Sequence, residues 1–151
     1  MMRPSLIQPD AELRDFLQGK VSVKVSSTRT EPVTVYRDWE RPTNKLPDDF
    51  IVVYMNGEPE GLGTDIEFAK GYIMVGLYCK MNDDGSVKVN RVRKILDKFD
   101  KLLIGLTTEN YHFDYDMPRF ITPTSPNQSS GYSITVLNLR WTTTINFAKT
   151  E

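Results

Sequence analysis

The chain has 151 residues, a length typical of one domain. Its formal net charge of −1 provides no general attraction for nucleic acid or for an anionic membrane surface. Its single cysteine excludes an internal disulfide, and its hydrophobic content of 39% predicts a modestly thin core, as in a chain with long loops or one completed by neighbours.

The sequence shows the pattern of neither a signal peptide nor a membrane-spanning segment. The N-terminal residues lack the apolar region of a signal peptide, and every apolar run is far shorter than the roughly 20 residues that cross a bilayer. We therefore expect an intracellular protein, or one assembled inside a cell, without a membrane partner. The prediction is one domain over 1–151, with a loose N-terminal segment at 1–8 and a short C-terminal tail at 145–151.

The first third of the chain predicts one short helix and two strands. Asp10 is a suitable N-cap for a helix over 11–20, and Gly19 is suited to its C-terminal end. Apolar and polar residues then alternate over 21–27, which predicts a half-exposed strand. The same alternation predicts a second strand over Pro32–Trp39.

Two loops surround a short buried strand in the middle of the chain. Prolines and acidic residues in Glu40–Asp49 predict a loop, and the β-branched and aromatic run Phe50–Met55 predicts a strand. Glycine and proline in Asn56–Asp65 predict a second loop. A phosphate-binding loop is disfavoured there, because no third glycine or Lys-Ser/Thr pair follows and the next element is not a helix.

The central segment Gly71–Lys80 is a long apolar run around which the predicted fold is organised. Side chains on a strand alternate between its faces, and both faces here carry apolar groups, which predicts a strand covered on both sides. The buried position of Cys79 favours a small core residue over a reactive thiol. A polar turn follows, and then an apolar stripe predicts a helix of about four turns. The stripe consists of Val89, Val92, Ile95, Leu96, Phe99, Leu102, Leu103 and Leu106.

The last third contains two strands separated by a long polar segment. Tyr111, Phe113 and Tyr115 alternate with polar residues, which predicts a strand with one aromatic face. Met117–Gly131 is too long for an ordinary connector, and Tyr132–Thr144 alternates as a long final strand. The predicted fold is α/β (α+β), with a single mixed, mostly antiparallel sheet flanked by two helices and joined by long loops.

The sequence offers little for metal chemistry. Its only histidine, His112, and its only cysteine lie on separate strands, which argues against zinc. Asp114 and Asp116 alternate with His112 along one strand, a pattern that fits a shared cation but is better explained as a water-exposed face. We expect no metal and no cofactor.

A catalytic site is also disfavoured. The carboxylate pairs Asp48–Asp49 and Asp83–Asp84 are predicted to lie in turns, where solvated carboxylates are poor general acids at neutral pH. No GxSxG motif accompanies the single histidine. The sequence therefore predicts a protein that is not an enzyme.

One flank of the predicted second helix is basic. Arg91, Lys94, Lys98 and Lys101 recur at steps of three and four and form one ridge. The simplest interpretation is a solvated helix face. The alternative is a nucleic-acid-binding accessory protein whose ridge makes salt-sensitive, sequence-independent contacts.

The order of these elements resembles that of the tail terminator (tail completion) proteins of long-tailed bacteriophages. After an N-terminal helix, a proline-bearing stretch leads into a short hydrophobic strand, here PTNKLPDDFIVVYM. A glycine-containing loop leads into the long strand GYIMVGLYCK, followed by a polar turn and the amphipathic helix VNRVRKILDKFDKLL. A late strand with a Trp closes the sheet, here YSITVLNLRWTTT. The resemblance covers roughly residues 8–145.

This resemblance implies a structural virion protein of the tail and neck, assembled in the host cytoplasm. It implies a homo-oligomeric ring, a hexamer, that ends polymerisation of the tail tube protein and binds the head completion (stopper) protein, with DNA passing through its lumen without specific recognition. A head–tail connector or stopper protein and a minor capsid protein remain alternatives. The residues predicted to make protein contacts lie in loops and are Arg41, Asn44, Lys45, Glu58, Glu60, Arg119, Phe120, Asn127 and Gln128.

Overall fold

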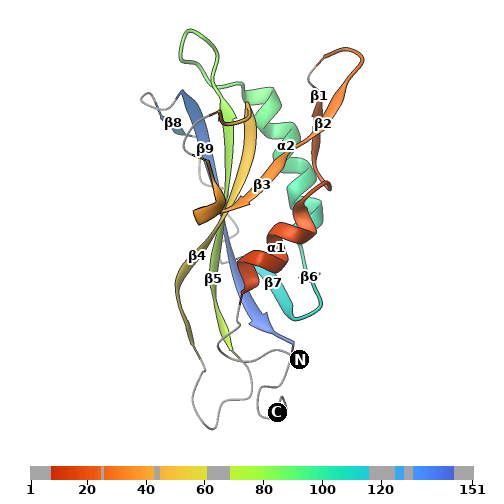
Figure 1. Ribbon diagram of the computed structural model, residues 1–151, viewed down its shortest axis with the longest axis vertical. Helices are drawn as coiled ribbons and strands as arrows, with labels where there is room; N and C mark the ends of the chain where they lie inside the picture. The colour runs from red at the N-terminus through yellow and green to blue at the C-terminus, as the bar shows by residue number, and fades with distance from the viewer. Residues whose placement is uncertain are drawn as a thin grey trace.

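Over the residues that it describes, the computed structural model in Figure 1 contains one large sheet, one small sheet and two α-helices. The residues that the structure describes are 8–24, 26–42, 45–60, 69–115, 125–127 and 131–144.

The large sheet has seven strands and is built around three long ones. Its order along the main path is β3 (Thr34–Arg37), β4 (Asp49–Glu60), β5 (Lys70–Lys80), β9 (Tyr132–Thr143), β7 (Tyr111–Tyr115) and β6 (Leu106–Thr107), with β8 (Ser125–Asn127) also paired to β9. Only β3 and β4 run parallel, and all other pairs are antiparallel. The predicted α+β fold with a mixed, mostly antiparallel sheet is confirmed.

A separate hairpin departs from the prediction of a single sheet. β1 (Ser22–Lys24) and β2 (Thr30–Pro32) pair only with each other and form a two-stranded sheet beside α2 (Figure 1). The backbone N–H of Val33 donates to the carbonyl of Val21 at 2.7 Å, and the N–H of Val35 donates to Oε1 of Gln18 at 3.0 Å. These bonds occupy the N–H of Val35 in β3 and that of Val33 just before it, on the outer edge that would otherwise be open to strand addition.

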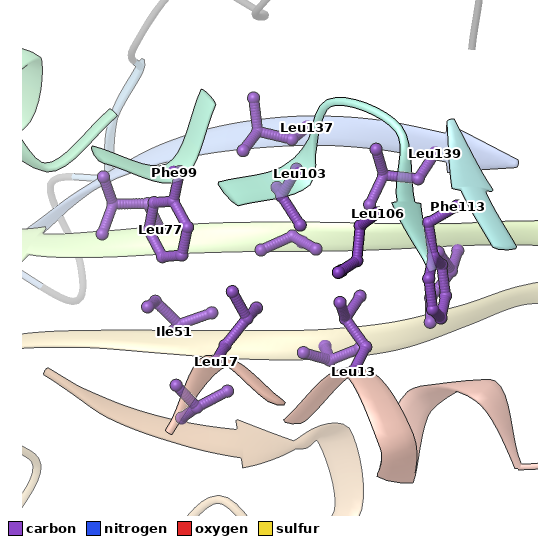
Figure 2. Close-up of a cluster of buried hydrophobic side chains, with 14 of the residues drawn as sticks. Leu13, Leu17, Ile51, Leu77, Phe99, Leu103, Leu106, Phe113, Leu137 and Leu139 are labelled. Atoms are coloured by element: carbon purple, nitrogen blue, oxygen red, sulfur yellow. The ribbon is translucent and has the colours of Figure 1, made fainter. Parts of the chain in front are cut away.

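Both helices, α1 (Pro9–Leu17) and α2 (Val89–Leu103), cover the same face of the large sheet (Figure 1). They do not lie on opposite sides. Figure 2 shows Leu13 and Leu17 of α1 in the cluster that also contains Phe99 of α2 and Leu77 of β5. The core therefore forms one layer between this sheet face and the two helices. Its other members include Ile51, Val53, Ile73, Val75, Ile95, Leu103, Tyr111, Phe113, Leu137, Leu139 and Trp141.

The opposite sheet face carries no helix in the described part of the chain. Aromatic side chains cover part of this face. Phe50 stacks on Tyr78 with ring centroids 4.7 Å apart, and the hydroxyl groups of Tyr54 and Tyr78 share a hydrogen bond. Toward the other end of β5, Tyr72 is 45% exposed. The prediction that both faces of β5 are covered is thus correct for the first face and only partly correct for the second.

The structure corrects the ends of α1 and β3. Gln8 is the N-cap of α1, whereas Asp10 lies inside the helix and pairs with Arg37 at 2.9 Å. The Asp10 carboxylate is buried and binds Arg37 from a distant part of the chain, so it does not cap the helix as its position in the sequence predicted. The predicted strand over Pro32–Trp39 ends at Arg37, and 38–40 form a short 3₁₀ helix.

Three further boundaries differ from the prediction. β4 continues to Glu60 through residues predicted as loop, because antiparallel pairing with β5 supports the backbone up to Lys70. The segment Met117–Gly131 contains the short strand β8. Helix α2 ends at Leu103, which places Leu106 in β6, while Val89 at the other end of the expected apolar stripe is 54% exposed.

Candidate functional site

An ion pair links the start of α2 to the start of β4. Nε of Arg91 donates to both carboxylate oxygens of Asp49, at 3.0 and 2.9 Å, and Nη2 donates as well. These hydrogen bonds raise the pKa of the Arg91 guanidinium. The Asp49 side chain is only 3% exposed. The prediction that this carboxylate is a solvated turn residue is wrong, because Asp49 is the first residue of β4 and its pairing with β5 places the side chain beneath α2.

The same helix flank holds the β1–β2 hairpin. Nη1 of Arg91 donates to the carbonyl of Lys24 at 3.3 Å, and Nζ of Lys98 donates to the carbonyl of Ser22 at 2.8 Å. The two carbonyls belong to alternate residues of β1 and therefore lie on the same edge of the strand. Two cations of α2 thus bind the free edge of a hairpin that has little support of its own.

Between helix and hairpin lies a groove, here named the basic groove, with a volume of about 420 Å³. Its lining residues are Ser22, Val23, Lys24, Thr30, Arg91, Lys94, Ile95 and Lys98. The structure thus brings three of the four ridge residues together, while Lys101 does not line the groove. Lys24 was missed by the helical pattern because it comes from a different element.

The four cations of the groove do not have the same freedom. Arg91 is held by Asp49 and Lys98 by a backbone carbonyl. Lys24 and Lys94 are exposed and form no ion pair within the described ranges. Their ammonium groups are available to an anionic ligand, and Val23 and Ile95 supply apolar lining between them.

A second hollow of about 290 Å³ lies on the helix-free sheet face, across β5, β9 and β7. Its polar lining comes from Lys70, Tyr72, His112, Asp114 and Arg140. These residues share the face because their strand positions are directly paired or two residues apart.

His112 makes two side-chain contacts at this hollow. Its Nε2 lies 2.9 Å from Oδ2 of Asp114, and its Nδ1 lies 2.8 Å from Oγ1 of Thr107. A hydroxyl, an imidazole and a carboxylate in a row have the connectivity of a hydrolytic triad. However, Thr107 and Asp114 are exposed, and water screens the coupling that would activate the hydroxyl. The arrangement fits the predicted water-exposed face of this strand.

The cysteine has a structural position. Cys79 is fully buried, as expected, and burial raises the pKa of its thiol. A buried, protonated thiol is a poor nucleophile.

The predicted contact loops are only partly within the described residues. The guanidinium of Arg41 lies over the Tyr78 ring at 5.5 Å from its centroid, and Lys45 is exposed with a φ of 55°. Glu58 and Glu60 belong to strand β4, and Asn127 belongs to strand β8, so the loop assignment of these three was wrong. The remaining predicted contact residues, Asn44, Arg119, Phe120 and Gln128, lie outside the described residues, as does Asp116.

Within the described residues, no three His, Cys, Asp or Glu side chains are grouped to hold a metal ion. In the same part of the chain, neither helix has the length and apolar character required to cross a bilayer. The chain matches no protein-family model, no curated protein and no solved structure in comparisons with known proteins.

Proposed function

We propose that this chain is a structural virion protein that forms a ring at the head-proximal end of a bacteriophage tail tube. In this role it ends polymerisation of the tube protein and joins the tail to the head through the head completion (stopper) protein. The ring is a hexamer of identical subunits, located at the neck of the virion, and DNA passes through its lumen without specific recognition.

The observation that carries this proposal is the order of elements along the fold. An N-terminal helix, the long central strand β5, the amphipathic helix α2 and the late Trp-bearing strand β9 occur in the order of the tail terminator proteins. Trp141 of β9 is buried in the core layer beside Gly71 of β5. The late aromatic strand thus stabilises the centre of the sheet.

Surface features of the subunit also suit an assembly role. The face with Tyr54, Tyr72 and Tyr78 is free of helices in the described part, and the β1–β2 hairpin lies apart from the large sheet. Such features give a small subunit several separate surfaces, as a ring component requires for its neighbours above, below and beside it.

A second candidate is binding of nucleic acid at the basic groove, favoured by the clustering of Lys24, Arg91, Lys94 and Lys98. Two of these cations already have partners within the chain, which leaves fewer free charges than the helical pattern suggested. This function predicts duplex DNA binding that weakens steeply with salt.

Growth of tail tubes tests the proposal. Purified tube protein is polymerised with and without this chain, and tube lengths are measured in electron micrographs. We expect tubes that stop growing, each with additional density at one end. Unchanged tube lengths and bare tube ends at a molar excess of the chain would contradict the proposed function.

A further inference from the structure

We propose that Asn56 and Gly57 form a site of spontaneous covalent modification, at which the side-chain amide of Asn56 is lost and a carboxylate takes its place. The site lies in the second half of β4 and requires only these two residues and water. This inference goes beyond the proposed function and does not depend on it, because the reaction takes place within a single chain.

The reaction proceeds through a ring formed by the two residues. The backbone nitrogen of Gly57 loses its proton to base and attacks Cγ of Asn56, which forms a five-membered succinimide. The bond between Cγ and Nδ2 of Asn56 breaks, and the amide nitrogen takes up protons and leaves as ammonia. Water then opens the ring at Cγ, which gives aspartate, or at the backbone carbonyl carbon, which gives isoaspartate. One water is consumed and one ammonia is released, with no oxidation or reduction.

The sequence and the exposure of the two residues favour this chemistry. Asparagine is among the thermally labile residue types, and Asn56–Gly57 is the one Asn-Gly pair in the sequence. Because glycine has no side chain, nothing attached to its α-carbon hinders attack by its nitrogen. Both residues are exposed, so water and base reach them.

At this site β4 has a neighbouring strand on only one side. β3 pairs with β4 over Phe50–Val53, and the second half of β4 extends beyond β3 (Figure 1). Asn56 pairs with Tyr72 of β5 and is the last residue of β4 in the continuous register. A residue that is bonded on one side and lies where regular pairing stops opens more readily than one inside a sheet.

Gly57 lies in a break of this register. After Asn56 the next pair is Glu60 with Lys70, so three residues of β4 lie opposite a single residue of β5. Within the described chain, Gly57 therefore pairs with neither neighbouring strand. Its φ of 83° is a left-handed conformation, which glycine adopts without strain. The nitrogen can thus turn toward the Asn56 side chain without first breaking a strand pair of its own.

The structure disfavours the same ring at Asp84–Gly85, where an aspartate precedes a glycine. The backbone N–H of Gly85 donates to the carbonyl of Asn82 at 2.9 Å. The hydroxyl and the backbone N–H of Ser86 both donate to Oδ1 of Asp84, at 2.6 and 2.9 Å, and these bonds lower the pKa of the Asp84 carboxyl. A bonded nitrogen and an ionised carboxylate both resist the reaction, so the fold separates two sites with similar sequences.

The product changes the charge of the helix-free sheet face. Asn56 and Tyr72 are directly paired, so their side chains share this face with Cβ atoms about 5 Å apart. Tyr72 lines the hollow that also contains Lys70 and Arg140. Aspartate at position 56 therefore adds a negative charge beside this hollow. Isoaspartate also lengthens the backbone by one carbon, which shifts the pairing with Tyr72.

Mass spectrometry of the full-length protein tests the proposal. The purified chain is kept at pH 8 and 37 °C, and samples taken over time are digested with trypsin. The peptide over 46–70 carries Asn56 as its one asparagine. We expect this peptide to convert into an aspartate form and an isoaspartate form, which have equal mass and separate by chromatography. Aspartate without isoaspartate would indicate direct hydrolysis and would overturn the ring mechanism.

Asp84→Asn provides the matched control, because it places a second Asn-Gly pair in the turn at 82–86. Its side-chain oxygen can still accept the bonds from Ser86. In the folded chain this pair should react at least tenfold more slowly than Asn56, since the Gly85 nitrogen is bonded to the Asn82 carbonyl. In concentrated guanidinium chloride at the same pH, the two pairs should react at similar rates.

Two results in the folded chain would overturn the inference. One is an equal rate at positions 56 and 84. The other is an unmodified Asn56 over a period in which the unfolded chain is converted.

The pH dependence and a second variant give an independent readout. The rate at Asn56 should rise from pH 7 to pH 9, because the Gly57 nitrogen must lose its proton before it attacks. Asn56→Gln should remain unmodified over the same period, since its ring would need six members. A rate that does not change with pH, or equal conversion of the Asn56→Gln variant, would contradict the proposed reaction.

Discussion

Replacing Arg91 by alanine should be the most destabilising change on the surface of α2. The substitution leaves the Asp49 carboxylate, 3% exposed, without the donors that now bind it. Breaking a buried pair by removing one partner costs about 3–5 kcal/mol. The bond to the Lys24 carbonyl is lost as well, which loosens the hairpin.

Urea unfolding, followed by the change in tryptophan fluorescence as the buried Trp141 becomes exposed, measures this loss. With a slope of about 2 kcal/mol per molar urea, the midpoint should fall by roughly 1.5–2.5 M. The matched control is Arg93→Ala on the same helix, where an exposed substitution should change stability by no more than about 0.5 kcal/mol. Equal midpoints for Arg91→Ala and Arg93→Ala would refute the buried ion pair.

Three further changes test the core and its surroundings. Gly71→Ala should cost about 1–3 kcal/mol in urea unfolding, because the new Cβ would lie 2.7 Å from the buried Trp141 ring. Phe99→Ala should cost about 3–5 kcal/mol by the same measurement, since this ring is fully buried between α2 and the sheet. Burial raises the pKa of Tyr111 to about 12, above the ordinary value of 10.0. Stability from its neutral phenol is therefore complete below about pH 10 and is lost as pH rises toward 12, so Tyr111→Phe should reduce the alkaline fall in stability measured by thermal unfolding at pH 9–12. At neutral pH this variant should lose about 1 kcal/mol with the bond from the Gln8 N–H to the hydroxyl.

Strand periodicity made the large sheet predictable. Each long strand has one face against the helices, and the alternation in Tyr132–Thr143 assigns Leu137, Leu139 and Trp141 to the buried face, as observed. The 3.6-residue stripe located α2 for the same reason: burial of a face imposes a period on the sequence. The same alternation predicted that His112 and Asp114 lie on the water-exposed face of β7.

Such patterns do not predict contacts between residues that are far apart in the sequence. Asp49 follows another aspartate in a proline-bearing stretch, and only the pairing of β4 beside β5 places it beneath Arg91, 42 residues later. For this reason the sequence predicted the cations that α2 contributes to the basic groove but not the one that β1 contributes. The ridge on α2 is visible in the sequence because its residues recur at helical spacing. Lys24 lies beside them only because β1 and β2 form a separate hairpin, and the alternation of apolar and polar residues does not show which strands pair.

The extension of β4 was missed for a related reason. Gly57 and a proline in its second half favour a turn locally, but backbone pairing resumes at Glu60 after an irregularity in the register. Tertiary pairing with Lys70 overrides the local preference.

The mass of the assembled protein tests the central claim most directly. Light scattering over a concentration series, alone and with tail tubes, gives the number of subunits, and electron micrographs of the same samples give their arrangement. The account predicts closed rings of six subunits with a central hole, free in solution or at one end of the tubes. A single-subunit mass at every concentration, with tubes whose ends carry no ring, would contradict it.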